Sequence, residues 1–141
     1  MKALVIYESL TGTTKLAAEK IAQKLEKHSY EATACPVNAI DLQQLSNADL
    51  VIIGSWTDGL IFAGQKPGRA NRLKNIPRID GKHVVVFCTY AIDPGKTLTK
   101  MQTIAENLGG DVIGGFAIKR SDIDEQVSQL VQRLDQLTIA A

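Results

Sequence analysis

The chain has 141 residues, of which 45% are hydrophobic and 22% are charged, as in an ordinary globular protein. Sixteen basic and fifteen acidic residues leave a formal net charge of +1, which argues against nucleic acid or an anionic membrane as a partner. No apolar run approaches the roughly 20 residues of a membrane-spanning helix, and Met1 and Lys2 lead straight into a strand pattern, with no room for a signal peptide. The sequence therefore predicts a single cytoplasmic domain over residues 1–141.

Apolar runs alternate with helical patterns along the whole chain. The predicted strands are residues 2–7, 31–35, 49–54, 83–89 and 111–118. The predicted helices are residues 13–27, 40–46, 67–75, 96–108 and 122–137. Segments 51–53 and 84–87 are apolar and β-branched on both faces, which is typical of central parallel strands. This alternation predicts the α/β class, with a doubly wound three-layer sandwich around a five-stranded parallel sheet.

The loop after the first predicted strand is rich in hydroxyl groups and reads Ser9-Leu10-Thr11-Gly12-Thr13-Thr14. Four hydroxyls, together with the free N–H groups and the positive dipole end of the following helix, form a potential phosphate-binding site. Gly12 lets backbone N–H groups point inward at low steric cost. The alternative interpretation is an ordinary helix N-cap.

The residues around this loop resemble the FMN phosphate-binding signature of flavodoxins. The matching positions are Val5-Ile6-Tyr7, Ser9, Gly12, Thr14, Ala18 and Ile21. The resemblance implies the flavodoxin-like strand order 2-1-3-4-5, with FMN bound beyond the carboxyl ends of the strands, beside the first strand. It also implies a short-chain member, because the long insertion that marks long-chain flavodoxins is missing before the last helix.

The predicted loop after the third strand holds the only tryptophan of the chain. Trp56 resembles the flavodoxin aromatic residue that is followed three residues later by a glycine, and we expect it to stack on the flavin ring. A tryptophan packed into the edge of the core is the alternative. In flavodoxins the next peptide turns toward the one-electron-reduced flavin, and Thr57 resists the positive φ that this turn favours. The candidate flavin contacts in this loop are Ser55, Trp56, Thr57, Asp58 and Gly59.

The loop after the fourth strand supplies the second set of candidate contacts, which are Cys88, Thr89, Tyr90 and Ala91. We expect Tyr90 to face the ring side opposite Trp56, and the backbone of residues 88–91 to pair with the polar edge of the flavin. The Gly-x-Gly-Asp turn that usually precedes the flavodoxin tyrosine is absent, and an exposed surface tyrosine is the alternative. Residues 94–97 resemble the end of a Walker A loop, but Tyr90 stands where its first glycine should be, which excludes a P-loop.

The sequence predicts neither a metal site nor a catalytic residue. Cys35 and Cys88 lie far apart and form no CxxC pair, so we expect two reduced thiols. His28 and His83 have no Cys, Asp or His neighbours at metal-ligand spacing. No nucleophile or acid–base pair is arranged for catalysis, so the redox chemistry is expected to belong to the flavin.

The resemblance implies an electron carrier that binds one FMN and shuttles electrons between a reductase donor and an acceptor protein. The alternatives are an FMN-dependent quinone or NAD(P)H oxidoreductase on the same fold, and a flavin-free binding module. Residues 66–82 are strongly basic, which ordinarily means a solvated helix face. The functional alternative is a docking surface for an acidic redox partner, or for the phosphates of NAD(P)H, at Lys66, Arg69, Arg72 and Lys74.

Overall fold

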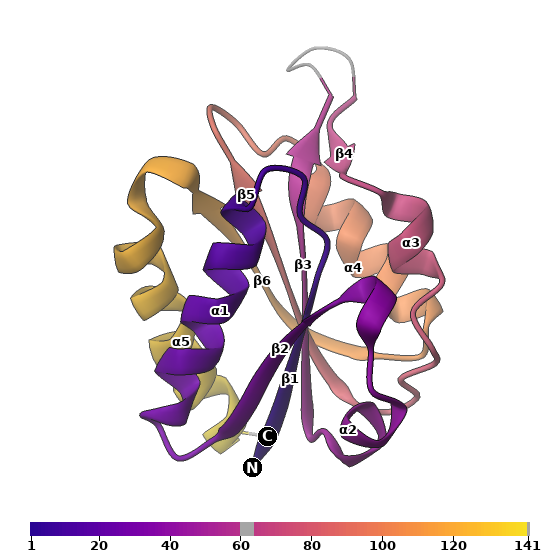
Figure 1. Cartoon of the computed structure of the whole chain (residues 1–141), viewed down its shortest axis with the longest axis vertical. Helices are drawn as coiled ribbons and strands as arrows, with labels where there is room; N and C mark the ends of the chain where they lie inside the picture. Colours follow the sequence, from indigo (N-terminus) through magenta and orange to yellow (C-terminus); the bar gives the residue numbers. More distant parts are fainter. Residues whose placement is uncertain (60–63, 141) are drawn as a thin grey trace.

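Five long parallel strands form the centre of the molecule in the computed structural model, which describes residues 1–59 and 64–140 (Figure 1). They are β1 (Lys2–Tyr7), β2 (Glu31–Pro36), β3 (Leu50–Asp58), β5 (His83–Tyr90) and β6 (Asp111–Lys119). Their order in the sheet is β2-β1-β3-β5-β6. This order confirms the predicted 2-1-3-4-5, because a two-residue strand β4 (Lys66–Pro67), which pairs only with β3, precedes the fourth long strand in the numbering.

Helices cover both faces of the sheet and confirm the three-layer sandwich (Figure 1). The helices α1 (Thr13–Glu26) and α5 (Ile123–Ala140) lie on one face. The other face carries α2 (Leu42–Asn47), α3 (Ala70–Lys74) and α4 (Thr97–Asn107). Short 3₁₀ turns at Val37–Ala39 and Arg120–Asp122 precede α2 and α5.

Each central strand sends alternate side chains into two separate apolar cores. Val5 and Ile52 pack on the side of α1 and α5, whereas Ile6 and Ile53 pack on the side of α2, α3 and α4. Burial on both faces explains why these strands are continuous apolar runs in the sequence.

Strand β3 is longer than the sequence predicts. It continues past Gly54 to Asp58, through the segment that we expected to be a loop. Trp56 pairs with Thr89 of β5 in parallel register, and Asp58 pairs with Lys66 of β4 in antiparallel register. The prediction was wrong because turn-forming residues dominate this segment, while its partner is a two-residue strand that no local pattern marks.

The predicted third helix is also shortened at its start. Pro67 belongs to β4, and the helix α3 begins only at Ala70. Arg69 precedes it in a left-handed conformation with φ 50°, which interrupts the predicted helix of residues 67–75.

Candidate functional site

A small cleft lies at the carboxyl ends of β1, β3 and β5, the end at which β4 and the connecting loops lie in Figure 1. It encloses about 130 Å³. Its walls come from four segments that are distant in the sequence: Ser9, Leu10, Thr11, Thr13, Thr14, Trp56, Thr57, Thr89, Tyr90, Ala91 and Arg120. Every one of these residues except Arg120 is a flavin contact predicted from the sequence.

The hydroxyl-rich loop ends in the exposed start of helix α1. Gly12 is the N-cap residue, with φ 96°, a left-handed conformation that glycine adopts without strain. As a glycine, this N-cap residue has no side chain to cap the helix, and no other described side chain does so. The Ser9 hydroxyl accepts a hydrogen bond from the Gly12 N–H at 3.1 Å. The first turn of α1 therefore keeps free backbone N–H groups, which favour an anion at this position.

Three of the threonines on the cleft wall are already bonded to other protein groups. The Thr14 and Thr89 hydroxyl oxygens lie 2.8 Å apart, and both side chains are buried. This bond joins the first turn of α1 to the end of β5. Arg120 donates a hydrogen bond from Nη2 to Thr13 Oγ1 over 3.3 Å.

Trp56 lines the cleft from β3 and packs against the chain just after β4. A Cβ atom built on Gly68 would lie 2.0 Å from the nearest indole atom, so the Gly68 backbone is in direct contact with the ring. Gly68 also donates its N–H to the Trp56 carbonyl at 2.8 Å. The guanidinium carbon of Arg69 lies over the ring, 5.4 Å from its centroid, which is a cation–π distance.

The β3–β4 segment is also tied to the loop after β5. Gln65 donates from its side-chain amide to the Asp93 carbonyl, and Lys100 of α4 donates to the Gln65 carbonyl at 2.8 Å. These bonds fix the wall that carries Trp56 relative to the wall that carries Tyr90.

Thr57 leaves one polar atom of the cleft region unsatisfied. Its Oγ1 is buried and has no hydrogen-bond partner of normal geometry among the described residues. The nearby Cys88 thiol is only a weak partner. Thr57 lies in the extended strand, and among the described non-glycine residues only Ser29 and Arg69 have positive φ.

The other predicted contacts do not line the cleft. Gly12 lines a neighbouring pocket, and Ser55 is buried, with its hydroxyl donating to the Gly68 carbonyl at 2.6 Å. Asp58 and Gly59 are exposed at the end of β3. The Cys88 side chain packs into the core on the side of α4, where burial raises its pKa to about 11. Successive side chains of a strand point to opposite faces of the sheet, so Ser55 and Cys88 point away from the cleft that Trp56 and Thr89 line.

Arg120 is the cleft residue that sequence reasoning missed. It lies directly after β6, whereas our sequence argument considered only the loops after the first, third and fourth strands. The carboxyl ends of all parallel strands in a sheet meet at one edge. The presence of a cationic residue directly after the fifth strand could therefore have identified Arg120 from the sequence.

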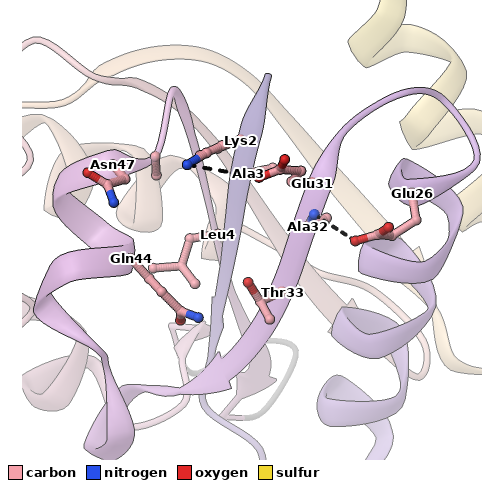
Figure 2. Close-up of a pocket in the computed structure, with 10 residues that line it drawn as sticks. Lys2, Ala3, Leu4, Glu26, Glu31, Ala32, Thr33, Gln44 and Asn47 are labelled. Atoms are coloured by element: carbon pink, nitrogen blue, oxygen red, sulfur yellow. Dashed lines mark hydrogen bonds and ion pairs between the residues drawn. The ribbon is translucent and has the colours of Figure 1, made fainter.

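A second pocket, of about 340 Å³, lies at the opposite end of the sheet, between β1, β2 and α2 (Figure 2). Its charged side chains are engaged with protein groups: Lys2 Nζ lies 3.9 Å from a Glu31 carboxylate oxygen, and Glu26 accepts the Ala32 N–H at 3.0 Å. The second contact satisfies a backbone donor on the outer edge of β2. This pocket lies at the amino ends of the strands, where parallel sheets do not ordinarily bind ligands.

The basic run of residues 66–82 divides into paired and unpaired side chains. Arg69 and Arg72 both reach the buried carboxylate of Glu8. Arg78 pairs with Asp80 at 2.7 Å, and Lys82 donates to the carbonyls of Ser46 and Ala48 at 2.9 and 2.8 Å. In the described part of the chain, Lys66 and Lys74 are exposed and have no polar side-chain partner.

The described residues contain no group of three or more His, Cys, Asp or Glu side chains that could hold a metal ion. Within the same residues, no helix combines the length and the apolar character needed to cross a membrane.

Comparisons with known proteins agree with this fold. A family model described as a flavodoxin domain matches residues 4–141. The chain is 23% identical over 128 residues to a flavodoxin of Clostridium beijerinckii, a match that covers 91% of this chain and 93% of that protein.

Solved structures resemble the chain over nearly its whole length. The crystal structure of oxidised flavodoxin 1 from Bacillus cereus has a TM-score of 0.73 and 19% identity, covering 100% of this chain and 99% of that one. A flavodoxin from the domain Archaea has a TM-score of 0.70 and 20% identity, covering 98% of this chain and 99% of that one. At these identities the solved structures show the shared fold, and the family model shows that the chain belongs to the flavodoxin family.

Proposed function

We propose that this protein binds one FMN noncovalently in the cleft at the carboxyl ends of β1, β3 and β5, and that it carries electrons between redox proteins. The observation that carries the proposal is the convergence of three groups on one cleft. These are an uncapped helix start with hydroxyls around it, a tryptophan and a tyrosine. Flavodoxins normally bind FMN, which has one phosphate and one flat ring system.

The donor set of the cleft fits FMN at both ends. The start of α1 and the hydroxyls of Ser9, Thr11 and Thr13 suit a phosphate, and Arg120 adds a positive charge beside them. Trp56 and Tyr90 supply aromatic surfaces for the ring. The Thr57 hydroxyl, which has only the weak Cys88 thiol contact, suits a ligand with polar ring atoms.

The cleft is small for a ligand of the size of FMN. Its volume of about 130 Å³ is below the roughly 300 Å³ at which enclosed ligand sites begin. A flavin seated there keeps part of its surface outside the protein, as direct electron exchange with a partner requires. The bound FMN supplies the electron-transfer chemistry, while the protein binds the phosphate, orients the ring and excludes water from the side of Trp56.

The proposed docking of redox partners rests on the positive charge of the segment around α3. Lys66 and Lys74 are exposed and unpaired within the described residues, and they lie close in sequence to Arg69 and Arg72. We infer that these four residues attract an acidic region of the reductase or of the acceptor. We also propose that the protein is cytoplasmic and that residues 1–141 form a single domain.

A titration of the flavin-free protein with FMN and with riboflavin tests the cofactor assignment. We expect FMN to bind at least 10-fold more tightly than riboflavin, because a hydrogen-bonded phosphate contributes at least about 1.4 kcal/mol. Flavin fluorescence should be quenched in the complex and partly recovered in Trp56→Ala. Equal affinity for the two flavins would contradict a phosphate site at α1. Unchanged flavin fluorescence in Trp56→Ala would remove Trp56 from the ring contacts.

A further inference from the structure

We propose that Arg69 is a positioning residue of the flavin site. Its side chain holds Trp56 in a fixed position relative to the loop between β1 and α1. The inference rests on the proposed function, because FMN would contact both of the parts that Arg69 joins. Arg69 belongs to neither part, since it lies between β4 and α3.

The Arg69 side chain reaches three groups at once. Its Nη1 donates to Glu8 Oε2 at 3.0 Å and to the Ser9 carbonyl at 3.4 Å. The same guanidinium lies over the Trp56 ring, 5.4 Å from the centroid. A planar guanidinium can donate hydrogen bonds in its plane while its flat face lies on an aromatic ring. Arg69 therefore links β3 to the first residues of the hydroxyl-rich loop.

Glu8 fixes the position of the Arg69 guanidinium. Its side chain is only 4% exposed, so water cannot solvate the carboxylate and a protein cation must compensate it. Arg72 also approaches Glu8 Oε2, but at 3.6 Å, and its side chain has no ring contact with Trp56 among the described residues. Arg72 therefore serves as a matched control that shares the ion pair without the link.

The backbone around Arg69 is fitted closely to this arrangement. Arg69 has φ 50°, a left-handed conformation that is uncommon for a residue with a side chain. The preceding Gly68 lies against the indole and has no room for a Cβ atom there. The conformation places the Arg69 guanidinium over a ring that Gly68 already contacts.

The consequence is a fixed separation between the two halves of the cleft. Trp56 contributes the wall from β3, and Ser9 begins the wall that carries the hydroxyls. Without Arg69, the Ser9 carbonyl and the Trp56 ring would lose their shared contact, and each wall would be free to shift. A ligand that bridges both walls would bind more weakly, because it would have to order them itself.

The test compares four variants of the full chain: Arg69→Gln, Arg69→Lys, Arg72→Gln and the double variant Glu8→Gln/Arg69→Gln. FMN and riboflavin affinities are measured for each. Acrylamide quenching of Trp56 is measured in the flavin-free proteins, where it reports on this side chain alone because the sequence has one tryptophan. The double variant removes the buried charge that Arg69→Gln would leave poorly compensated, so it stays folded if the single variant does not.

We expect Arg69→Gln to bind FMN about 10- to 100-fold more weakly, since it loses a cation–π contact and charged hydrogen bonds. Trp56 should become more accessible to acrylamide in this variant. Arg69→Lys should lie between Arg69→Gln and the native chain, because an ammonium keeps the charge but not the planar fork. Arg72→Gln should change FMN affinity less than about threefold, and the double variant should remain as weak as Arg69→Gln.

Recovery of native affinity and native quenching in the double variant would mean that Arg69 only neutralises Glu8, which overturns the positioning role. Native behaviour of Arg69→Gln, or equal losses in the Arg69→Gln and Arg72→Gln variants, would overturn it as well. If the native chain binds no FMN, the proposed function fails. Trp56 quenching in the flavin-free variants would still decide whether Arg69 holds the ring.

Discussion

Arg120 brings a positive charge to a cleft whose other described lining residues are uncharged. Its guanidinium is exposed and lies 3.3 Å from the Thr13 hydroxyl. We expect Arg120→Gln to weaken FMN binding about 5- to 10-fold, which is less than a buried charged hydrogen bond contributes, because solvent screens an exposed cation. Riboflavin, which lacks the phosphate, should bind as before.

Lys119→Gln is the matched control for Arg120, because Lys119 is an exposed neighbour outside the cleft. Titrations at low and high salt should show a weaker salt dependence of FMN affinity in Arg120→Gln than in the native chain. An equal loss of FMN and riboflavin affinity would place Arg120 at the ring rather than at the phosphate.

The bond between Thr14 and Thr89 predicts a stability effect that does not depend on any ligand. Thr14→Val leaves the buried Thr89 hydroxyl without its partner, which should lower the free energy of unfolding by about 1–3 kcal/mol. The double variant Thr14→Val/Thr89→Val removes both polar groups and should be closer to the native chain. Urea unfolding of Thr14→Val, Thr89→Val and the double variant measures the coupling energy between the two side chains. Additive losses of stability would show that the two hydroxyls do not interact.

At the level of elements, Gly68 decides how closely the chain after β4 can approach β3. Gly68→Ala places a Cβ about 2.0 Å from the Trp56 ring, so either the ring or the β3–β4 segment must move. We expect a loss of about 1–3 kcal/mol in stability, as for other overpacked sites, together with a shift in Trp56 emission.

Gly114→Ala in β6 is the control, because its nearest atoms lie at 3.5 Å, an ordinary contact distance. Thermal unfolding of the two variants, followed by Trp56 emission, separates a local clash from a general cost of replacing glycine. If both variants unfold at the native temperature, the close contact between Gly68 and the indole is not maintained in solution.

At the level of the whole molecule, an electron carrier exchanges electrons with a reductase and not directly with a nicotinamide. NADPH alone should therefore reduce the bound FMN very slowly, and an added flavoprotein reductase should make the reduction fast. Stopped-flow absorbance follows both reactions. Rapid, saturable NADPH oxidation by the protein alone would instead favour the oxidoreductase alternative.

The proposed docking surface is best tested at Lys66 and Lys74, because Arg69 and Arg72 also pair with Glu8. Charge reversal in Lys66→Glu/Lys74→Glu should slow reduction by the reductase several-fold at low salt and leave FMN affinity unchanged. The effect should fade as salt rises, since exposed charges are screened beyond about 10 Å at 0.1 M. Lys27→Glu, at the far end of α1, is the control, and an equal slowing there would argue against a localised docking surface.

The sequence by itself determined the features that are encoded locally. Continuous apolar runs gave the five long strands, and the hydroxyl cluster from Ser9 to Thr14 indicated a special loop before α1. The strand order came from the family resemblance, because periodicity alone does not distinguish one doubly wound order from another. Trp56 and Tyr90 were predicted at the cleft because each lies one or two residues past the end of a predicted strand.

Only the tertiary structure decided the contacts that join distant segments. Arg69 is 61 residues from Glu8, Thr14 is 75 residues from Thr89, and Arg120 is 107 residues from Thr13. The pairing of β3 with β4 likewise depends on a partner of two residues. A local pattern fixes backbone periodicity and the buried face of an element, but such polar contacts depend on where the whole sheet brings loops together. For that reason, the sequence predicted most of the cleft wall, while the contacts of Arg69 with Glu8 and Trp56 and of Arg120 with Thr13 emerged only from the folded chain.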